Sequence, residues 1–520
     1  MAFRCKNCGG NILFDVDSQS MKCRHCESVF PPEEYRVLDH STQSSFPEEG
    51  LTMFTCAGCG AALQGTEESQ VGFCPYCGGQ SLLHIGKNEK NATEYLLPFQ
   101  VSKEKCAELF RENAKKVRYL PRELKNPEHL KSFTGIYMPY YEYDVQMGQS
   151  HIKGTTVENH ASYEIVNTFQ IDASVSDNLC SVPFDASRYL DDEIASRLLP
   201  YDRRKERQFN AAYLSGFYAD ASTVPPKTYY RDAEAQASKD VVEEVAERIR
   251  AEQGITVDTK TSHVDAKTQG HHSALLPMWF LTWRKGDRVA YAVVNGESGK
   301  VVSDLPVDLR AFFAGCGMIA VILFAVLELL FQPTPLLTSV ISLIAGVLMA
   351  ATVCKSTKQI FEKQTHVHDK GWSVVAKPVV QEVQTEIKRK RQPKTNLPLA
   401  LLVFFGTIAA FFVLPFVHAS LPQLIAIAAV IYLVLEIRKV VSWQRAIPEK
   451  QPLISMVLIL AAVILNAVIV FVTPVSDFWY YLGDAACILI LVAASVGMTQ
   501  VYNMGATRPL PKLFDRNEVG

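Results

Sequence analysis

The sequence lacks the short patterns that mark common catalytic sites. Neither an HExxH nor a GxSxG pattern occurs in its 520 residues. The stretch Gly296-Glu-Ser-Gly-Lys300 is similar to a phosphate-binding loop, but that loop needs a glycine at position 294 and a Ser or Thr at position 301. Both positions are valine. We therefore expect a hairpin turn at 296–299 and a protein that is not an enzyme.

The first residues lack the basic stretch and the apolar core of a cleavable signal peptide, since the chain opens MAFRCKNCGG. Cysteines that hold zinc must remain thiolates, which requires a reducing compartment. On these grounds we expect the N-terminal half in the cytosol.

Positive charge is scarce in the first 100 residues, where seven Lys or Arg stand against twelve Asp or Glu, a formal charge of −5. Each four-thiolate zinc site adds about −2. Residues 51–85 contain no Lys or Arg, and the candidate basic patch is limited to Arg4, Lys6, Lys22 and Arg24. Nucleic-acid binding requires a basic surface, so charge argues against it and favours a surface that docks proteins.

Cysteine is present in an ordered pattern. Eight of the thirteen cysteines follow Cys-x2-Cys-x14-Cys-x2-Cys, written twice with an offset of 51 residues. Four thiolates in two CxxC knuckles suit a tetrahedral zinc ion at about 2.3 Å. We predict two zinc ions, with rubredoxin-like iron sites or redox dithiols as the competing interpretations and His25 as a bystander. The predicted ligands are Cys5, Cys8, Cys23 and Cys26 in ribbon one, and Cys56, Cys59, Cys74 and Cys77 in ribbon two.

Long apolar runs begin at Ala311. Six segments approach the ~20 residues that cross a 30 Å hydrocarbon layer: 311–331, 336–354, 397–417, 421–437, 453–473 and 479–499. The short connections within the three pairs carry no Lys or Arg, whereas 355–396 holds ten basic and four acidic residues. By the positive-inside rule, the long loops and both termini are expected in the cytosol.

One basic run precedes the third of these segments. Lys388, Arg389, Lys390 and Arg391 are candidates for holding anionic lipid headgroups, and a plain topology signal is the alternative.

Polar residues within the apolar segments are candidates for a transport pathway. Of Glu328, Glu436, Asp484 and Asn466, only Asn466 is expected deep in the membrane. A pathway needs several such groups at one level, so we favour a structural role for them.

The region between the ribbons and the membrane combines helical and strand patterns. Helices are expected at 103–117, after Ser102, and at 239–253, before Gly254. Strands are expected within 133–180 and at 276–283, 288–295 and 300–303. The segments 135–145 and 275–283 look alike, which hints at a duplicated strand unit. The pairs His271-His272 and His366-x-His368 are expected in loops, and Asp191-Asp192-Glu193 at a helix start.

The predicted fold is multidomain, with two tandem four-cysteine zinc ribbons, an α+β soluble domain and a C-terminal all-α membrane domain of six helices in three hairpins. The divisions are zinc ribbon 1 at 1–30, a linker at 31–50, zinc ribbon 2 at 51–85, the cytosolic α+β domain at 96–305, membrane hairpin 1 at 311–354, the basic cytosolic loop at 355–396, membrane hairpin 2 at 397–437, membrane hairpin 3 at 453–499 and a cytosolic tail at 500–520.

Several stretches carry a family resemblance: Tyr95–Phe99, Ser102–Val117, Leu120-Pro121, Phe133–Tyr141, Leu276–Trp279 and Val294–Val302. With the twin ribbons, they resemble bacterial zinc-ribbon membrane proteins labelled TFIIB-type or primosomal-helicase-like. Some of these are similar to membrane partners of flotillin-like (SPFH) and phage-shock-A-like proteins, and the resemblance implies a role in recruiting such factors. The chain departs from that pattern at Glu27, where a glycine is usual, and in its six expected spans.

These observations predict a non-enzymatic adaptor in the bacterial cell membrane, multi-pass, with cytosolic termini. Its partners would be the lipid bilayer and proteins of the SPFH/flotillin-like or phage-shock-A-like kind, and the sequence leaves a homo-oligomer open. A transporter or channel with a zinc-ribbon regulatory domain is the first alternative, and a membrane-tethered nucleic-acid binder is the second.

Overall fold

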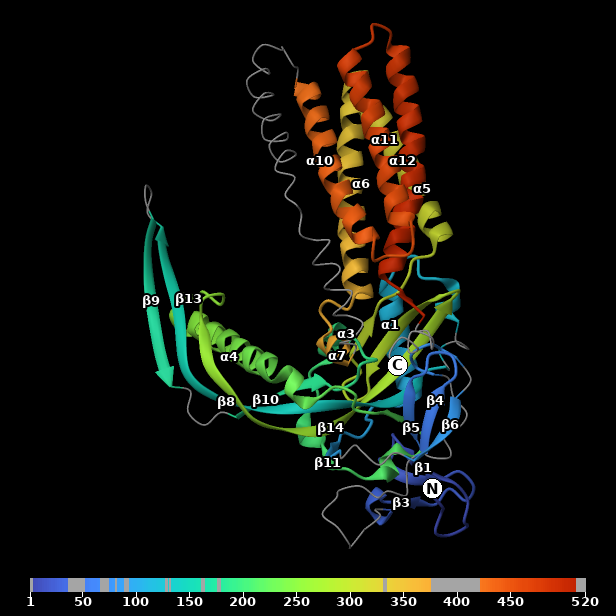
Figure 1. Cartoon of the computed structure of the whole chain (residues 1–520), viewed down its shortest axis with the longest axis vertical. Coiled ribbons are helices and arrows are strands. Elements are labelled where there is room, and N and C mark those ends of the chain that lie inside the picture. Colours follow the sequence, from blue (N-terminus) through green and yellow to red (C-terminus); the bar gives the residue numbers. More distant parts are fainter. Residues whose placement is uncertain are drawn as a thin grey trace.

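The structure is a computed structural model, and it describes residues 3–35, 52–65, 74–79, 82–87, 93–126, 130, 132–159, 164–174, 179–330, 334–375 and 421–510. A bundle of long helices forms one end of the molecule, and a body of strands and shorter helices lies beneath it (Figure 1). The first ribbon lies at the end of the body farthest from the bundle, and an arm projects sideways from the body.

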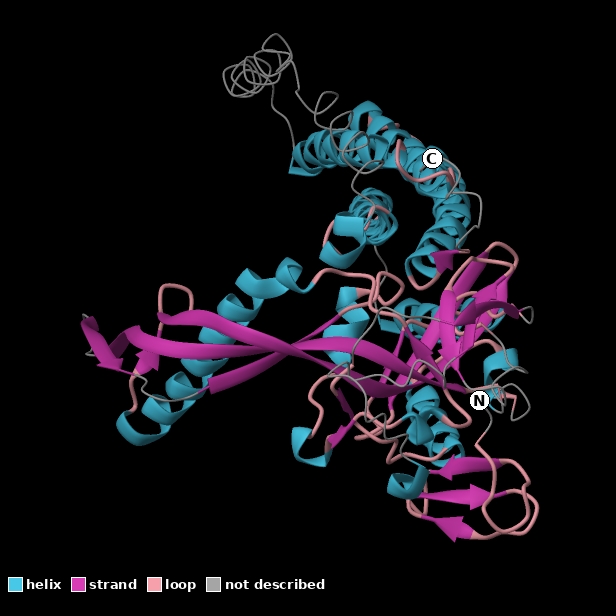
Figure 2. Ribbon diagram, turned by 60° about the horizontal axis from the view of Figure 1, so that its bottom comes forward, coloured by secondary structure: helices cyan, strands magenta, loops and turns pink. Residues whose placement is uncertain are grey.

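Two long antiparallel strands form the spine of the body. β8 (Thr134–Asn159) and β14 (His263–Lys285) pair from Thr134↔Phe280 at one end to His151↔His263 at the other. The inner part of β14 is buried on both faces, whereas its outer part alternates between buried and exposed residues. The pair therefore begins as core strands and leaves the body as the arm (Figure 2).

Further elements complete the body, and α4 (Tyr230–Gln253) runs along the arm. The remaining strands are β7 (Tyr95–Leu96), β9 (Glu164–Ser174), β10 (Leu179–Asp185), β11 (Arg207–Gln208), β12 (Tyr218–Asp220), β13 (Thr256–Val257), β15 (Arg288–Asn295) and β16 (Val301–Ser303). The remaining helices are α1 (Lys103–Lys116), α3 (Asp192–Leu198), α7 (Lys370–Val375) and the 3-10 turns η1 (Pro32–Tyr35), η3 (Arg122–Lys125), η4 (Arg203–Lys205), η5 (Ala211–Leu214) and η6 (Pro226–Tyr229).

The helix over 103–117 and the strands 288–295 and 300–303 are confirmed by α1, β15 and β16. The helix predicted at 239–253 ends as expected at Gly254, whose φ is +67°, but it begins nine residues earlier at Tyr230. Its first turns are buried through Ala233 and Ala237, which are too small to produce a clear apolar stripe.

The strand expected at 276–283 begins at His263, so the expectation that His271-His272 lies in a loop is wrong. The outer part of β14 is covered on one face only and contains many polar residues. An apolar sequence pattern therefore does not mark this part of the strand. The two look-alike segments pair with one another, with Pro277 opposite Tyr137 and Leu275 opposite Pro139.

Both ribbons are joined to the body. Ribbon one is a separate three-stranded sheet of β1 (Ile12–Asp15), β2 (Ser20–Cys23) and β3 (Val29–Phe30). Ribbon two contributes β4 (Thr52–Cys56), β5 (Ala62–Gly65) and β6 (Leu82–Lys87). β5 pairs with β12, and β12 pairs in parallel with β8, so ribbon two extends the main sheet.

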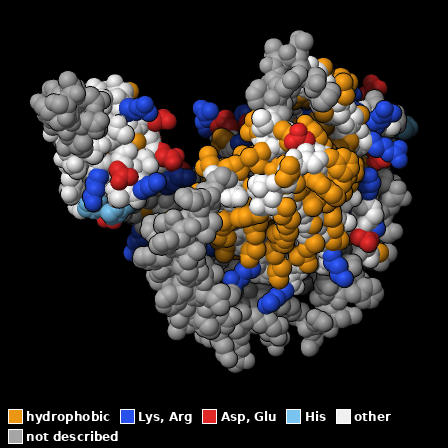
Figure 3. Space-filling model, turned by 90° about the horizontal axis from the view of Figure 1, so that it is seen from above, with side chains coloured by type: hydrophobic (Ala, Val, Ile, Leu, Met, Phe, Trp, Pro, Cys, Tyr) orange, Lys and Arg blue, Asp and Glu red, His pale blue; other side chains and the backbone are white. Residues whose placement is uncertain are grey.

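The bundle consists, in the described part, of α5 (Leu309–Leu330), α6 (Pro335–Gln364), α10 (Leu421–Gln444), α11 (Gln451–Val472) and α12 (Asp477–Gly505). Apolar side chains gather over it when it is seen from above, whereas the arm carries charges of both signs (Figure 3). Three of these helices, α6, α11 and α12, are long and apolar enough to cross a membrane.

Of the six predicted spans, three are therefore supported as candidates in the part of the chain that the structure describes. In α5, the apolar stretch with described side chains is Leu309–Leu323, and it is not among the three candidates. The segment 421–437 lies in α10, which carries Glu436 and Arg438 and is not among the three. The segment 397–417 lies outside the described residues.

The bundle is tied to the body at its lower end. The guanidinium of Arg288 in β15 donates to the carbonyl oxygens of Met504 (2.7 Å) and Thr507 (3.0 Å) and pairs with Glu449. After α12 the chain returns to the body, where β17 (Arg508–Pro509) pairs with β15. The segment that follows α12 is therefore part of the sheet.

Candidate metal centres

The four cysteines of ribbon one converge on one point. The Sγ atoms of Cys5 and Cys26 are 3.6 Å apart, and those of Cys8 and Cys23 are 3.5 Å apart. Thiolates arranged tetrahedrally around zinc at about 2.3 Å lie about 3.8 Å from one another. The cluster therefore has the dimensions of a zinc site. Cys5 and Cys23 are buried, whereas Cys8 and Cys26 are exposed.

Ribbon two repeats this arrangement inside the body. The sulfur separations are 3.4 Å for Cys56 and Cys77 and 3.6 Å for Cys59 and Cys74, and all four residues are buried. Two four-cysteine centres able to hold a metal ion are therefore present, as the spacing predicts.

The knuckles place one residue each in the left-handed backbone region. Gly9, Gly60 and Gly78 have φ of +70°, +70° and +68°, and Glu27 occupies the corresponding position with φ +58°. In each knuckle the N–H of this residue donates to the carbonyl of the first cysteine, at 2.8–3.1 Å. A side chain in this conformation is strained by roughly 1–2 kcal/mol, which explains why glycine occupies three of the four positions.

Hydrogen bonds and burial shift the pKa values of the thiols in opposite directions within each cluster. The proximity of the Cys56 thiol is the chief cause that raises the pKa values of Cys59 and Cys74, and the same neighbours lower the pKa of Cys56. In ribbon one the hydroxyl of Ser28 lowers the pKa of Cys26 to about 6. Four thiolates at this separation repel one another, and a divalent cation between them would neutralise two of the four charges.

Ribbon two is held by the aromatic core of the body. Its cysteines share a hydrophobic cluster with Phe54, Tyr218 and Phe280. Between its last two cysteines, the hydroxyl of Tyr76 donates to Asp220 at 2.6 Å. Burial raises the pKa of Asp220 to about 6. These contacts make ribbon two a structural part of the core.

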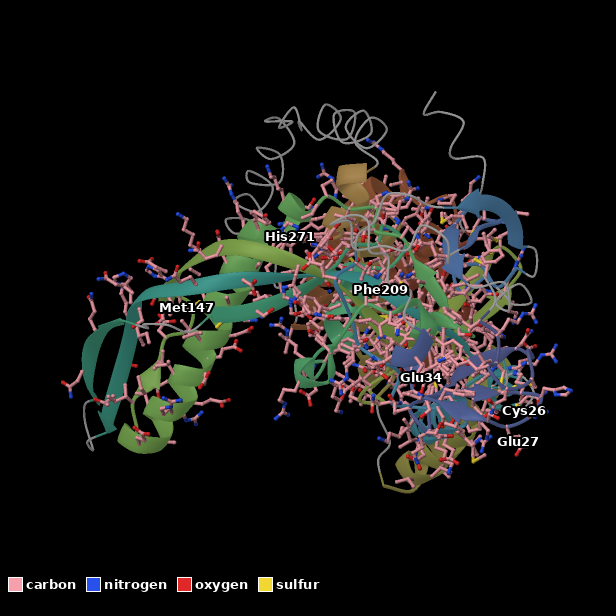
Figure 4. All side chains as sticks on the ribbon, turned by 90° about the horizontal axis from the view of Figure 1, so that it is seen from below. Cys26, Glu27, Glu34, Met147, Phe209 and His271 are labelled. Atoms are coloured by element: carbon pink, nitrogen blue, oxygen red, sulfur yellow. The ribbon has the colours of Figure 1, made fainter. Side chains whose placement is uncertain are left out.

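Ribbon one has one attached face and one free face. The hydroxyl of Ser215 donates to the carbonyl of Ile12 (2.9 Å), and the amide of Gln19 donates to that of Phe99 (2.6 Å). Cys26 and Glu27 lie at the outer margin of the molecule (Figure 4). The exposed basic residues of ribbon one are Arg4, Lys6, Lys22 and Arg24, and His25 is also exposed.

The other predicted site residues are not brought together. The run Lys388–Arg391 and the side chain of Glu328 lie outside the described part. Asp484 accepts hydrogen bonds from Thr338 and Ser339 in α6.

The remaining polar residues of the helices lie apart from Asp484. Glu436 contacts Cys354 (2.6 Å) and Lys439 (2.7 Å). Asn466 is 1% exposed, and its amide has no hydrogen-bond partner in the described part of the chain.

Two further groups of potential metal ligands were missed by sequence reasoning. Glu142, Glu206 and His272 converge in the body, but Arg203 occupies that site with its Nε 2.5 Å from Glu142. The site is therefore an ion-pair network. His151, His263 and Asp265 converge on the arm. Strand pairing alone brings these residues together.

Taken together, the fold and its centres define a class of protein with two four-cysteine metal centres in a mixed α/β body, beneath a bundle of apolar helices. The chain is similar in sequence to the "Uncharacterized protein YdjG" of Bacillus subtilis (strain 168). It is 26% identical over 323 residues, which are 61% of this chain and 94% of the relative. No family model and no solved structure matches the chain. The similarity points to a bacterial relative and transfers no activity, because the relative's name states none.

Proposed function

We propose that this chain is a non-enzymatic bacterial membrane adaptor that docks a protein partner on ribbon one. The observation that carries this proposal is the free knuckle of ribbon one at the end of the body farthest from the apolar helices, where Cys8 and Cys26 are exposed. The helices anchor the molecule, and the body holds the docking surface at a fixed distance from them.

The contrast between the ribbons supports this division of roles. Ribbon two is enclosed by the body and stabilises it. Ribbon one retains an exposed edge with Lys22 and Arg24, and Glu27 maintains a strained backbone there in place of glycine. Strain that persists at an exposed position is an indication of function, because a glycine would relieve it.

The proposed topology is that of a multi-pass protein of the bacterial cell membrane with cytosolic termini. The zinc thiolates require a reducing compartment. The basic loops favour the same side of the membrane under the positive-inside rule. The three candidate spans are compatible with this topology.

The proposed partners are flotillin-like (SPFH) or phage-shock-A-like proteins, as the resemblance of the chain implies. The basic edge of ribbon one would face an acidic surface of such a partner, because complementary charge favours specific docking.

The experiment uses the full chain in nanodiscs and measures binding of a purified flotillin-like or phage-shock-A-like protein by biolayer interferometry. The Lys22→Glu/Arg24→Glu variant reverses the charge of the edge and keeps all eight ligands. We expect at least a tenfold loss of affinity relative to the native chain. The control Lys115→Glu/Lys116→Glu reverses two exposed charges on α1 and should bind as the native chain does.

Equal binding by the native chain and the ribbon variant would contradict docking on ribbon one. Absence of binding by the native chain would contradict the choice of partner.

Transport is a second candidate because Asn466 is buried among the helices without a partner in the described part of the chain. Ion flux in liposomes that is lost in Asn466→Leu would favour transport. A bilayer that stays tight with the native chain would exclude it.

A further inference from the structure

We propose that His151, His263 and Asp265 form a third metal site, on the arm, for a divalent transition cation such as Zn²⁺ or Ni²⁺. The ligand atoms of the three side chains all lie within 4.8 Å of one another. The site is distinct from both four-cysteine centres in its location and in its ligands.

Strand pairing creates the cluster. His151 in β8 and His263 in β14 are directly opposite one another, and their ring centroids are 4.9 Å apart. Asp265 lies two residues after His263 and therefore points to the same face of β14. Nitrogen and oxygen ligands at about 2.0–2.1 Å from a tetrahedral metal lie about 3.3 Å apart. Side-chain rotations at this partly exposed surface would bring the ligand atoms to that separation.

An irregularity in the pairing positions the carboxylate. Val264 pairs with Ser150 and Ala266 with Met147, so Gly148 and Gln149 together face Asp265. A bulge of this kind redirects the side chain beside it. A Cβ atom at Gly148 would lie 3.1 Å from the Cβ of Asp265, so glycine there allows the close approach.

The opposite face of the strand pair is fixed by α4. Val264 is 3% exposed, and its N–H donates a hydrogen bond to the hydroxyl of Ser238 in α4 at 2.8 Å. Met147, labelled in Figure 4, lies on the same stretch of the arm and is also buried. Histidine side chains are visible at the surface of the arm in the space-filling view (Figure 3). The scaffold that presents the ligands is therefore supported from behind.

The ligand chemistry selects the metal. Imidazole nitrogens suit zinc, nickel and copper, whereas oxygen-rich sites suit magnesium and calcium. Three protein ligands leave at least one coordination position open, as in zinc sites that bind water or an external group. The third site can therefore accept a ligand from solvent or from another molecule, which the closed four-cysteine centres cannot.

The test is a Ni²⁺ titration by calorimetry of the full chain in detergent, purified without a histidine tag, with both ribbons loaded with zinc. We expect one equivalent of Ni²⁺ to bind the native chain while two zinc ions per chain are retained, as measured by mass spectrometry of the metals. His263→Ala should weaken Ni²⁺ binding at least a hundredfold, and Asp265→Asn about tenfold.

His271→Ala is the matched control, because His271 lies on the same strand outside the cluster and contacts Tyr230. It should bind Ni²⁺ as the native chain does. The proposal is overturned if the native chain binds no Ni²⁺, or if His263→Ala binds it as tightly as the native chain and His271→Ala.

Discussion

At the scale of single residues, Glu27 has the most unusual position in the metal centres. It is the one non-glycine residue among the four left-handed knuckle positions, with φ +58°, and it is exposed. Its conformation therefore follows from the knuckle formed by the preceding ligands Cys23 and Cys26, not from its own preference.

Replacing Glu27 by glycine should relieve this strain. We expect ribbon one of Glu27→Gly to be more stable by about 1 kcal/mol. Glycine adopts the left-handed conformation without the strain of a side chain, and this gain in free energy exceeds the larger loss of backbone entropy that glycine undergoes on folding. In a chelator competition, this corresponds to zinc held roughly five times more tightly at one of the two sites.

The reciprocal change provides the control. Gly78→Ala puts a Cβ at φ +68° in ribbon two, 3.5 Å from the side chain of Thr282, and should weaken zinc binding there. Weaker zinc binding in Glu27→Gly would show that the glutamate side chain itself supports the knuckle.

At the scale of elements, the two ribbons should respond differently to loss of a ligand. Cys77→Ser affects a buried centre inside the core cluster, whereas Cys8→Ser affects an exposed one. We expect Cys77→Ser to destabilise the whole body by several kcal/mol, because it leaves buried thiols without their ion. Cys8→Ser should lose one zinc ion and leave the body folded. Zinc content and limited proteolysis measure both effects, and equal proteolysis of the two variants would contradict the difference.

The segment after α6 docks on the body through acidic residues. The N–H of Lys370 donates to Asp192 at 3.0 Å, and Asp369 is 6% exposed. Burial raises the pKa of Asp192 to about 6, and burial followed by the charges of Asp192 and Asp369 raises that of Asp185 well above its usual range. Three carboxyl groups therefore share a confined space.

This cluster makes docking of the segment depend on pH. A carboxyl whose pKa is raised in the folded state stabilises that state while protonated, and the contribution declines as pH rises from about 4 through the folded pKa. We expect hydrogen-exchange protection of 366–372, corrected for intrinsic rates, to fall between about pH 4 and about pH 6, and further as Asp185 ionises.

The variant Asp185→Asn keeps the shape of the side chain and removes its charge, so the decline should be smaller. Asp240→Asn on the exposed face of α4 is the control and should retain the full decline. Protection that rises with pH would contradict the assignment.

At the scale of the whole molecule, the body and the bundle are joined at several points. The ammonium of Lys363 in α6 pairs with Asp304 at 2.8 Å, and Asn503 in α12 exchanges two hydrogen bonds with the backbone of Val307. These contacts place the body directly beneath the helices and fix its distance from the membrane in the proposed topology.

The proposed topology predicts which loops face outward. Val475, between α11 and α12, is fully exposed, and Lys450 precedes α11 at the opposite end of that helix. We expect Val475→Cys to react with a membrane-impermeant maleimide in intact cells, and Lys450→Cys only after permeabilisation. Labelling of Lys450→Cys in intact cells would reverse the topology.

The sequence alone determined the features that arise from short stretches of chain. The CxxC spacing located both metal centres, because their ligands lie within about 20 residues of one another and within tight knuckles. Local periodicity and turn residues located α1, the end of α4 at Gly254 and the hairpin of β15 and β16. Apolar runs located the described helices of the bundle, and three of these helices satisfy the requirements of a span.

The way in which distant segments of the chain meet depends on the tertiary structure. His151 and His263 lie more than a hundred residues apart and converge because β8 and β14 pair in one register. Ribbon two joins the main sheet through β12, and ribbon one is fastened by Ser215, far along the chain. The outer half of β14 has no apolar pattern because one of its faces meets solvent. Long-range strand pairing and one-sided burial leave little signal in a single sequence. These features of the tertiary structure produce the arm, the third candidate metal site and the free face of ribbon one.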